Sequence, residues 1–110
     1  MPTLFRNSIT NGIGQTPVDV ISMPLGARAT IIGCNLANIT DYDTVNVTVY
    51  VLDQDSASGT YVKGLTIPPN SAVKIITNGE KLILPEFGGL RIVSDLDGSV
   101  DAVISYVEIT

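Results

Sequence analysis

The clearest pattern in the chain is an unbroken alternation of valine with polar or aromatic residues between positions 44 and 52. Valine takes every second place, at Val45, Val47, Val49 and Val51. The residues between them are Thr44, Asn46, Thr48 and Tyr50. Side chains in a strand point to opposite faces with a period of two, so this segment predicts a strand with one valine face and one polar face. No segment of comparable length carries a helical period, and the sequence therefore predicts an all-β protein.

Further short apolar segments follow one another from residue 17 to the C-terminus. The eight segments that we expect to form strands are residues 18–23, 29–37, 44–52, 61–67, 72–77, 82–84, 90–94 and 100–109. About eight short strands in one small chain indicate a single antiparallel β-sandwich, either a jelly roll or an immunoglobulin-like fold. We assign residues 16–110 to this domain.

The segments that precede and separate the strands have their own signals. Residues 1–15 are polar and lack a period, so we expect an extended N-terminal arm that is free or lies on a neighbour. The pairs Asn78-Gly79 and Asp97-Gly98 tolerate the positive φ of a type I′ turn, and each is expected to join two antiparallel neighbours.

Composition narrows the classes of partner. A chain of 110 residues and 11.6 kDa is one domain's worth of material. Six basic and eleven acidic residues give a net charge of −5, which disfavours attraction to nucleic acid phosphates or to an anionic membrane. The chain has no apolar run of signal-peptide or transmembrane type, so we expect a soluble protein made in the cytosol.

The residue types that carry catalysis are sparse. Cys34 is the single cysteine and the chain contains no histidine, so we interpret Cys34 as a small buried hydrophobe rather than a nucleophile or metal ligand. The spacing of the carboxylates indicates no acid/base pair, and tryptophan, a common sugar platform, is absent. We therefore expect neither an enzyme nor a cofactor.

Two acidic segments could in principle hold calcium. Residues 53–59 resemble a calcium loop, but the glycine falls one place late and Gly64 stands where a bidentate glutamate is needed. Asp95, Asp97 and Asp101 flank a turn, where aspartate is favoured in its own right. A solvated loop is the preferred interpretation of both segments.

The remaining sequence features concern association with other proteins. The face formed by Thr44, Asn46, Thr48 and Tyr50 has no charge, which suits burial against another subunit. Tyr50 and Tyr61 could anchor an interface or bind a sugar, or could pack on their own sheet.

Nearly the whole chain resembles a group of small virion proteins of tailed bacteriophages. The segments that carry the resemblance are GQTPVDVI (14–21), IIGCNLAN (31–38), VKGLTIPP (62–69), GEKLIL (79–84) and VISYVEI (103–109). Such proteins are β-sandwich modules, present in many copies, that decorate the capsid or form part of the neck or tail. The resemblance implies no catalytic residues.

The resemblance and the residues together predict a non-enzymatic structural protein located in the virion. The favoured role is a capsid decoration or cement protein that contacts the major capsid protein as a homo-oligomer, with a trimer favoured. The residues expected at interfaces are Leu4, Phe5, Thr44, Asn46, Thr48, Tyr50 and Tyr61. Residues 1–15 would pair with a neighbour by strand addition. The alternatives are a neck, tail or baseplate subunit, or a carbohydrate-binding module that uses Tyr50 or Tyr61 and residues 53–55.

Overall fold

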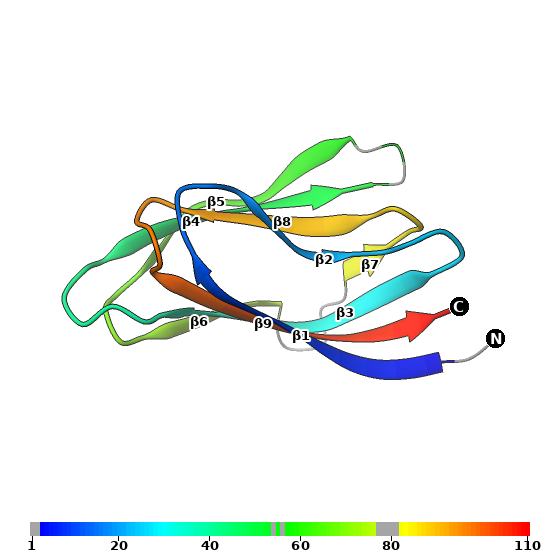
Figure 1. The fold of residues 1–110 in the computed structure, drawn as a ribbon, viewed down its shortest axis with the longest axis horizontal. Coiled ribbons are helices and arrows are strands. Elements are labelled where there is room, and N and C mark those ends of the chain that lie inside the picture. Colours follow the sequence, from blue (N-terminus) through cyan, green and yellow to red (C-terminus); the bar gives the residue numbers. More distant parts are fainter. Residues whose placement is uncertain (1–2, 54, 56, 77–81) are drawn as a thin grey trace.

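The structure is a computed structural model that describes residues 3–53, 55, 57–76 and 82–110. In this part of the chain every regular element is a strand (Figure 1), and no helix is long and apolar enough to cross a membrane. The strands are β1 (Thr3–Ile13), β2 (Val18–Ser22), β3 (Arg28–Asn38), β4 (Val45–Leu52), β5 (Ser58–Ile67), β6 (Ala72–Ile76), β7 (Leu82–Leu84), β8 (Gly89–Ser94) and β9 (Val100–Ile109).

The strands form two antiparallel sheets packed face to face (Figure 1). Sheet A has the order β1-β9-β3-β6, with β7 also paired to β3, and sheet B has the order β2-β8-β4-β5. The predicted all-β antiparallel sandwich is confirmed. Strands β6 and β7 pair with successive parts of the same edge of β3, so they act as one interrupted strand. Counted in this way, consecutive strands are distributed between the sheets as in a jelly roll rather than as in an immunoglobulin fold.

The core lies between the two sheets and uses the alternation seen in the sequence. Val45, Val47 and Val49 of β4 are fully buried, and they belong to the same core cluster as Ile31 and Leu36 of β3. The residues between the valines point away from the core, as a period of two requires. The apolar face predicted for residues 44–52 is therefore the inner face of sheet B.

The N-terminal segment differs from the expected arm. Residues 3–13 form β1, which pairs with β9 of the same chain from Thr3 opposite Ile109 to Ile13 opposite Val100. Ile13 is buried, and the Ser8 hydroxyl donates to the carbonyl of Val20 at 2.8 Å. An edge strand can be held by main-chain hydrogen bonds without a long apolar face, which is why hydrophobic periodicity missed it.

The two expected hairpin turns also differ. Gly98 has the predicted positive φ, 65°, but the turn joins β8 of sheet B to β9 of sheet A instead of two paired neighbours. Asn78-Gly79 lies outside the described residues. The strands on either side of it, β6 and β7, pair with β3 rather than with each other. A local turn signal cannot distinguish a hairpin from a crossing between sheets.

Candidate interaction surface

The outer face of sheet A is rich in apolar side chains. Along β1, β9, β3 and β7, the residues that alternate with the buried ones point to this face. We call this surface the A face, and its central residues are Phe5, Asn7, Ile9, Thr30, Ile32, Asn35, Ile83, Val103, Ser105 and Val107. No charged side chain belongs to this described central set, and Lys74, Arg28 and Asp101 lie around it.

Several apolar side chains of the A face are largely exposed to solvent. Phe5 is 81% exposed, Ile83 70% and Ile9 66%. The strand register places Phe5 beside Val107 and Ile9 beside Val103, so apolar side chains lie side by side on β1 and β9. The next residues in these rows, on β3, are Thr30 and Asn35. The outer face of an antiparallel sheet that meets water is ordinarily polar, and a contiguous apolar patch marks an interaction site.

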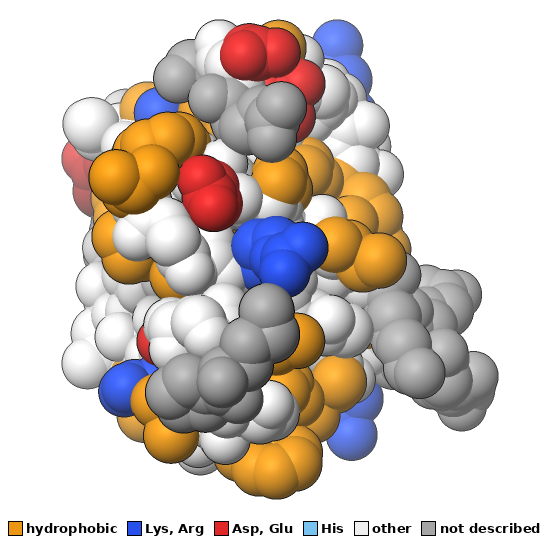
Figure 2. Space-filling model, turned by 90° about the vertical axis from the view of Figure 1, so that its right-hand side faces the viewer, with side chains coloured by type: hydrophobic (Ala, Val, Ile, Leu, Met, Phe, Trp, Pro, Cys, Tyr) orange, Lys and Arg blue, Asp and Glu red, His pale blue; other side chains and the backbone are white. Residues whose placement is uncertain are grey.

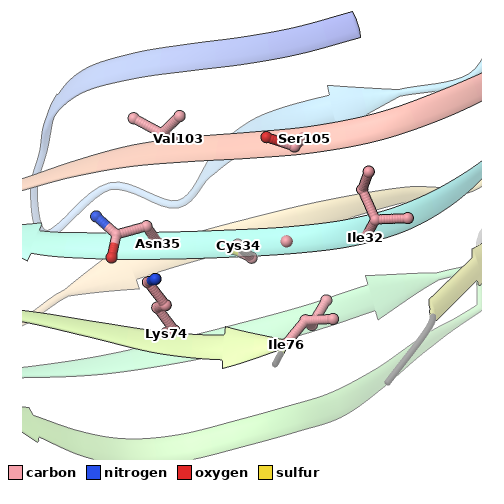
Figure 3. Close-up of a pocket in the computed structure, with 8 residues that line it drawn as sticks. Ile32, Cys34, Asn35, Lys74, Ile76, Val103 and Ser105 are labelled. Carbon is pink, nitrogen blue, oxygen red and sulfur yellow. The ribbon is translucent and has the colours of Figure 1, made fainter. Parts of the chain in front are cut away.

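A hollow interrupts the A face where β3 is irregular. Its volume is about 550 Å³, and Gly33, which is one of the residues that line it, has no side chain. Ile32 and Val103 stand at its rim, with Lys74 and Ser105 on facing sides (Figure 3). The register of β3 shifts on both sides of this point, between Ile31 and Gly33 and again at Cys34. The hollow is thus built into the backbone, and it offers room for one inserted side chain.

Cys34 borders the same region but lies in the core, as its sequence context predicted. Burial raises the pKa of the thiol from 9.0 to about 12. The thiolate is the reactive form of cysteine, so this side chain is inert at neutral pH.

A second exposed apolar group lies at the end of the sandwich that carries the termini. Leu25, in the turn between β2 and β3, is 76% exposed, and Phe87, in the turn between β7 and β8, is 53% exposed. The two turns are joined, because Met23 N–H donates to Gly88 O and Phe87 N–H donates to Met23 O. Figure 2 shows that charged side chains are interspersed with the apolar ones at this end.

The face predicted from Thr44, Asn46, Thr48 and Tyr50 is the outer side of β4 and the turn before it, in sheet B. Strand β4 itself is uncharged, but its neighbour β8 contributes Arg91 opposite Tyr50. Arg91 Nε donates to Asp19 Oδ1 at 2.7 Å, and this hydrogen bond raises the pKa of the guanidinium. The assembled face therefore carries charges that one strand read alone does not reveal.

The other expected interface residues are dispersed. Phe5 is a central residue of the A face, whereas Leu4 points to the opposite side of β1. Tyr50 is half-buried opposite Thr60, and Tyr61 lies at the adjoining register shift. Ile9, Ile32, Ile83 and Val103 were missed. A usable signal was present in residues 103–107, where every position except Ser105 is apolar or aromatic. Apolar side chains on both faces of a strand are typical of a strand that is covered on both sides.

The acidic side chains near the turns are engaged with the backbone. Asp97 accepts from Gln15 N–H and Asp101 from Gly12 N–H, both at 2.8 Å, while Asp95 accepts from Asn46 N–H. Asp53 accepts from the N–H groups of Asp55 and Ala57, and residues 54 and 56 of that loop lie outside the description. Across the described ranges, no three acidic or cysteine side chains are grouped so as to hold a metal ion.

The fold and this surface define the chain as a jelly-roll sandwich with an exposed apolar sheet face. No protein-family model matches the sequence, and a comparison with curated proteins finds no significant match. Among solved structures, the chain is similar to a protein described by "Bacillus endospore appendages form a novel family of disulfide-linked pili". The TM-score is 0.58 at 9% identity, over 98% of this chain and 88% of the other. At that identity the similarity establishes the fold alone.

Proposed function

We propose that this chain is a non-enzymatic structural subunit of a bacteriophage particle, with decoration or cementing of the capsid as its role. The observation that carries the proposal is the A face, because Phe5, Ile9 and Ile83 expose apolar surface that a lone subunit has no reason to keep. A subunit that works by covering and joining other proteins requires such a surface.

Two further points support an assembly role. The solved structure with a similar fold is described in terms of disulfide-linked pili. The resemblance of the sequence to small phage virion proteins is the reason for proposing a bacteriophage particle as the assembly. The partners in this proposal are further copies of the chain and the major capsid protein.

Cryo-electron microscopy of purified phage particles, with an antibody raised against the chain, tests the proposal. We expect regularly spaced density on the outer surface of the head, and lower capsid stability to heat in particles that lack the protein. Absence of the chain from purified particles would overturn the proposal.

Location within the particle is decided by the same images. Density on the shell at sites of local symmetry fits a decoration protein. Rings around the tail axis would instead assign the chain to the neck, tail or baseplate, and would replace the cementing role while retaining the structural class.

A further inference from the structure

We propose that the A face binds a second copy of this chain, through a two-fold axis that lies between the two faces and runs across the strands. This inference deepens the proposed function and rests on it, because it names the occupant of the surface that carries that function. The argument uses the strand register, the hollow at Gly33, the charges at the two ends of the face and the available area.

The register arranges the A face in rows that cross the sheet. One row contains Phe5 and Val107, the middle row contains Asn7 and Ser105, and the third contains Ile9 and Val103. Rotation about an axis over the middle row keeps β1 over β1 and reverses the order of the rows. Phe5 then lies over Ile9 of the partner subunit, and Val107 lies over Val103 of the partner subunit. On β1 and β9, apolar side chains therefore meet apolar side chains, as in the core of a sandwich. On the other half of the face, Ile83 in the first row lies over Lys74 of the partner subunit, which continues the third row.

The Ile32 side chain projects from the A face and matches the hollow of a second copy. Ile32 is 47% exposed and stands on the rim of the hollow, beside Gly33. The axis passes close to both, so the Ile32 side chain of each copy faces the hollow of the other. The hollow of about 550 Å³ has space for an isoleucine side chain. One projection and one hollow on the same surface are the requirement of a two-fold interface, in which each contact occurs twice.

The charged residues at the two ends of the A face favour this axis over an axis parallel to the strands. Arg28 lies at one end of the face, opposite Ile109, and Asp101 lies at the other end, opposite Ala37. Rotation about the axis across the strands brings each Arg28 to the end that carries Asp101 of the partner subunit. An axis parallel to the strands would place the two Arg28 ends together instead, and like charges in contact are unfavourable.

The available area is sufficient. The molecule measures 46 × 25 × 21 Å along its principal axes, and its strands follow the longest one (Figure 1). A sheet face of that outline offers on the order of 1,000 Å², compared with roughly 800 Å² per partner in a standard protein interface.

The test is the mass of the purified full chain by multi-angle light scattering across a concentration series. We expect a dimer for the native chain. Ile32→Asp, which places a charge in the hollow, is expected to weaken association at least tenfold, whereas Thr60→Lys, an exposed position on β5 of sheet B, leaves it unchanged. Arg28→Asp and Asp101→Arg should each weaken the dimer, and the double variant should restore it.

A cross-linking measurement keeps the test independent of folding defects in those variants. Ser105→Cys places a thiol beside the axis, so it should cross-link to the same residue of the partner subunit, while Thr60→Cys should not. A native monomer, an oligomer insensitive to Ile32→Asp, or no selective cross-link at Ser105→Cys would overturn the two-fold pairing. A trimer detected on phage heads would overturn this inference and leave the proposed function in place.

Discussion

Asn38, the last residue of β3, is buried and uses its whole side-chain amide. Its Nδ2 group donates to the carbonyls of Asp43 at 2.7 Å and Ile67 at 3.0 Å, and its Oδ1 accepts from the N–H and hydroxyl of Thr40. One side chain thus connects the end of β3, the loop toward β4 and the end of β5. Apolar residues cannot satisfy these groups, because the carbonyls need donors away from water.

Replacing Asn38 with alanine is expected to reduce the free energy of unfolding by about 3 kcal/mol, since it leaves buried polar groups without partners. Asn38→Asp should be at least as destabilising at neutral pH, because a carboxylate would face two carbonyl oxygens. Urea denaturation followed by circular dichroism measures both. Asn11→Ala, an exposed asparagine of β1, is the control and should change stability by less than about 0.5 kcal/mol. Equal effects at the two positions would contradict the role given to Asn38.

The raised pKa of Cys34 has a consequence for alkaline stability. The folded chain holds the proton up to about pH 12, whereas the unfolded chain releases it near pH 9. Above pH 9 the unfolded state therefore binds fewer protons, and stability must fall as the pH rises toward 12, by at most about 4 kcal/mol. Cys34→Ala should lack this part of the pH dependence, which denaturation curves at pH 8 and pH 11 measure as a difference between the two proteins. A parallel pH dependence in both would exclude the thiol as its cause.

Phe87 imposes strain on the turn between β7 and β8. Its φ is 63°, at the third position of a turn in which Gly88 N–H donates to Pro85 O. Glycine or asparagine normally occupies such a position, and Asn70 with φ of 56° is the ordinary case in this chain. A bulky residue there is an outlier.

We expect Phe87→Gly to be more stable than Phe87→Ala by about 1 kcal/mol, because only glycine removes the clash that a Cβ makes in this conformation. Both variants lose the ring, so the comparison isolates the backbone. Thermal denaturation measures it. Equal stability of the two variants would show that the turn carries no strain.

The pairing of β1 changes the expected effect of deleting the N-terminal residues. An arm could be deleted with the isolated fold intact, but β1 pairs with β9 along its length and contributes Ile13 to the core. We expect deletion of residues 1–13 to lower the melting temperature by at least 10 °C and to cause aggregation through the uncovered edge of β9. Deletion of residues 1 and 2 alone is the control. A soluble truncated chain with an unchanged melting temperature would restore the interpretation as an arm.

The strands themselves were largely predictable from local pattern, whereas their arrangement was not. The alternation from Val45 to Val51 and the apolar segments elsewhere located every strand from β2 to β9 within a few residues. Sheet order depends on contacts between distant segments, such as Thr3 with Ile109, and leaves no trace in a short window. The A face escaped detection for the same reason, because Phe5, Ile32 and Ile83 lie in three separate segments that only the folded sheet brings together.

At the scale of the whole molecule, the C-terminal strand is central. β9 lies between β1 and β3 in sheet A, and it pairs with both over most of its length. Sheet A therefore cannot form until the last ten strand residues are available. Removal of residues 100–110 should leave an unfolded or aggregated chain, which proteolysis of the purified protein would reveal, while removal of Thr110 alone should have no effect. A compact, protease-resistant product without β9 would contradict this dependence.

The pairing of Thr3 with Ile109 places the two ends of the chain side by side at one end of the sandwich (Figure 1). A domain fused to either terminus would therefore lie at that end of the sandwich and would not cover the centre of either sheet face. The chain is therefore suited to carrying a fused protein at one terminus or at both, because such a fusion leaves the A face free for pairing with another copy. A circular permutant, with the two ends joined by a short linker, would use the same proximity.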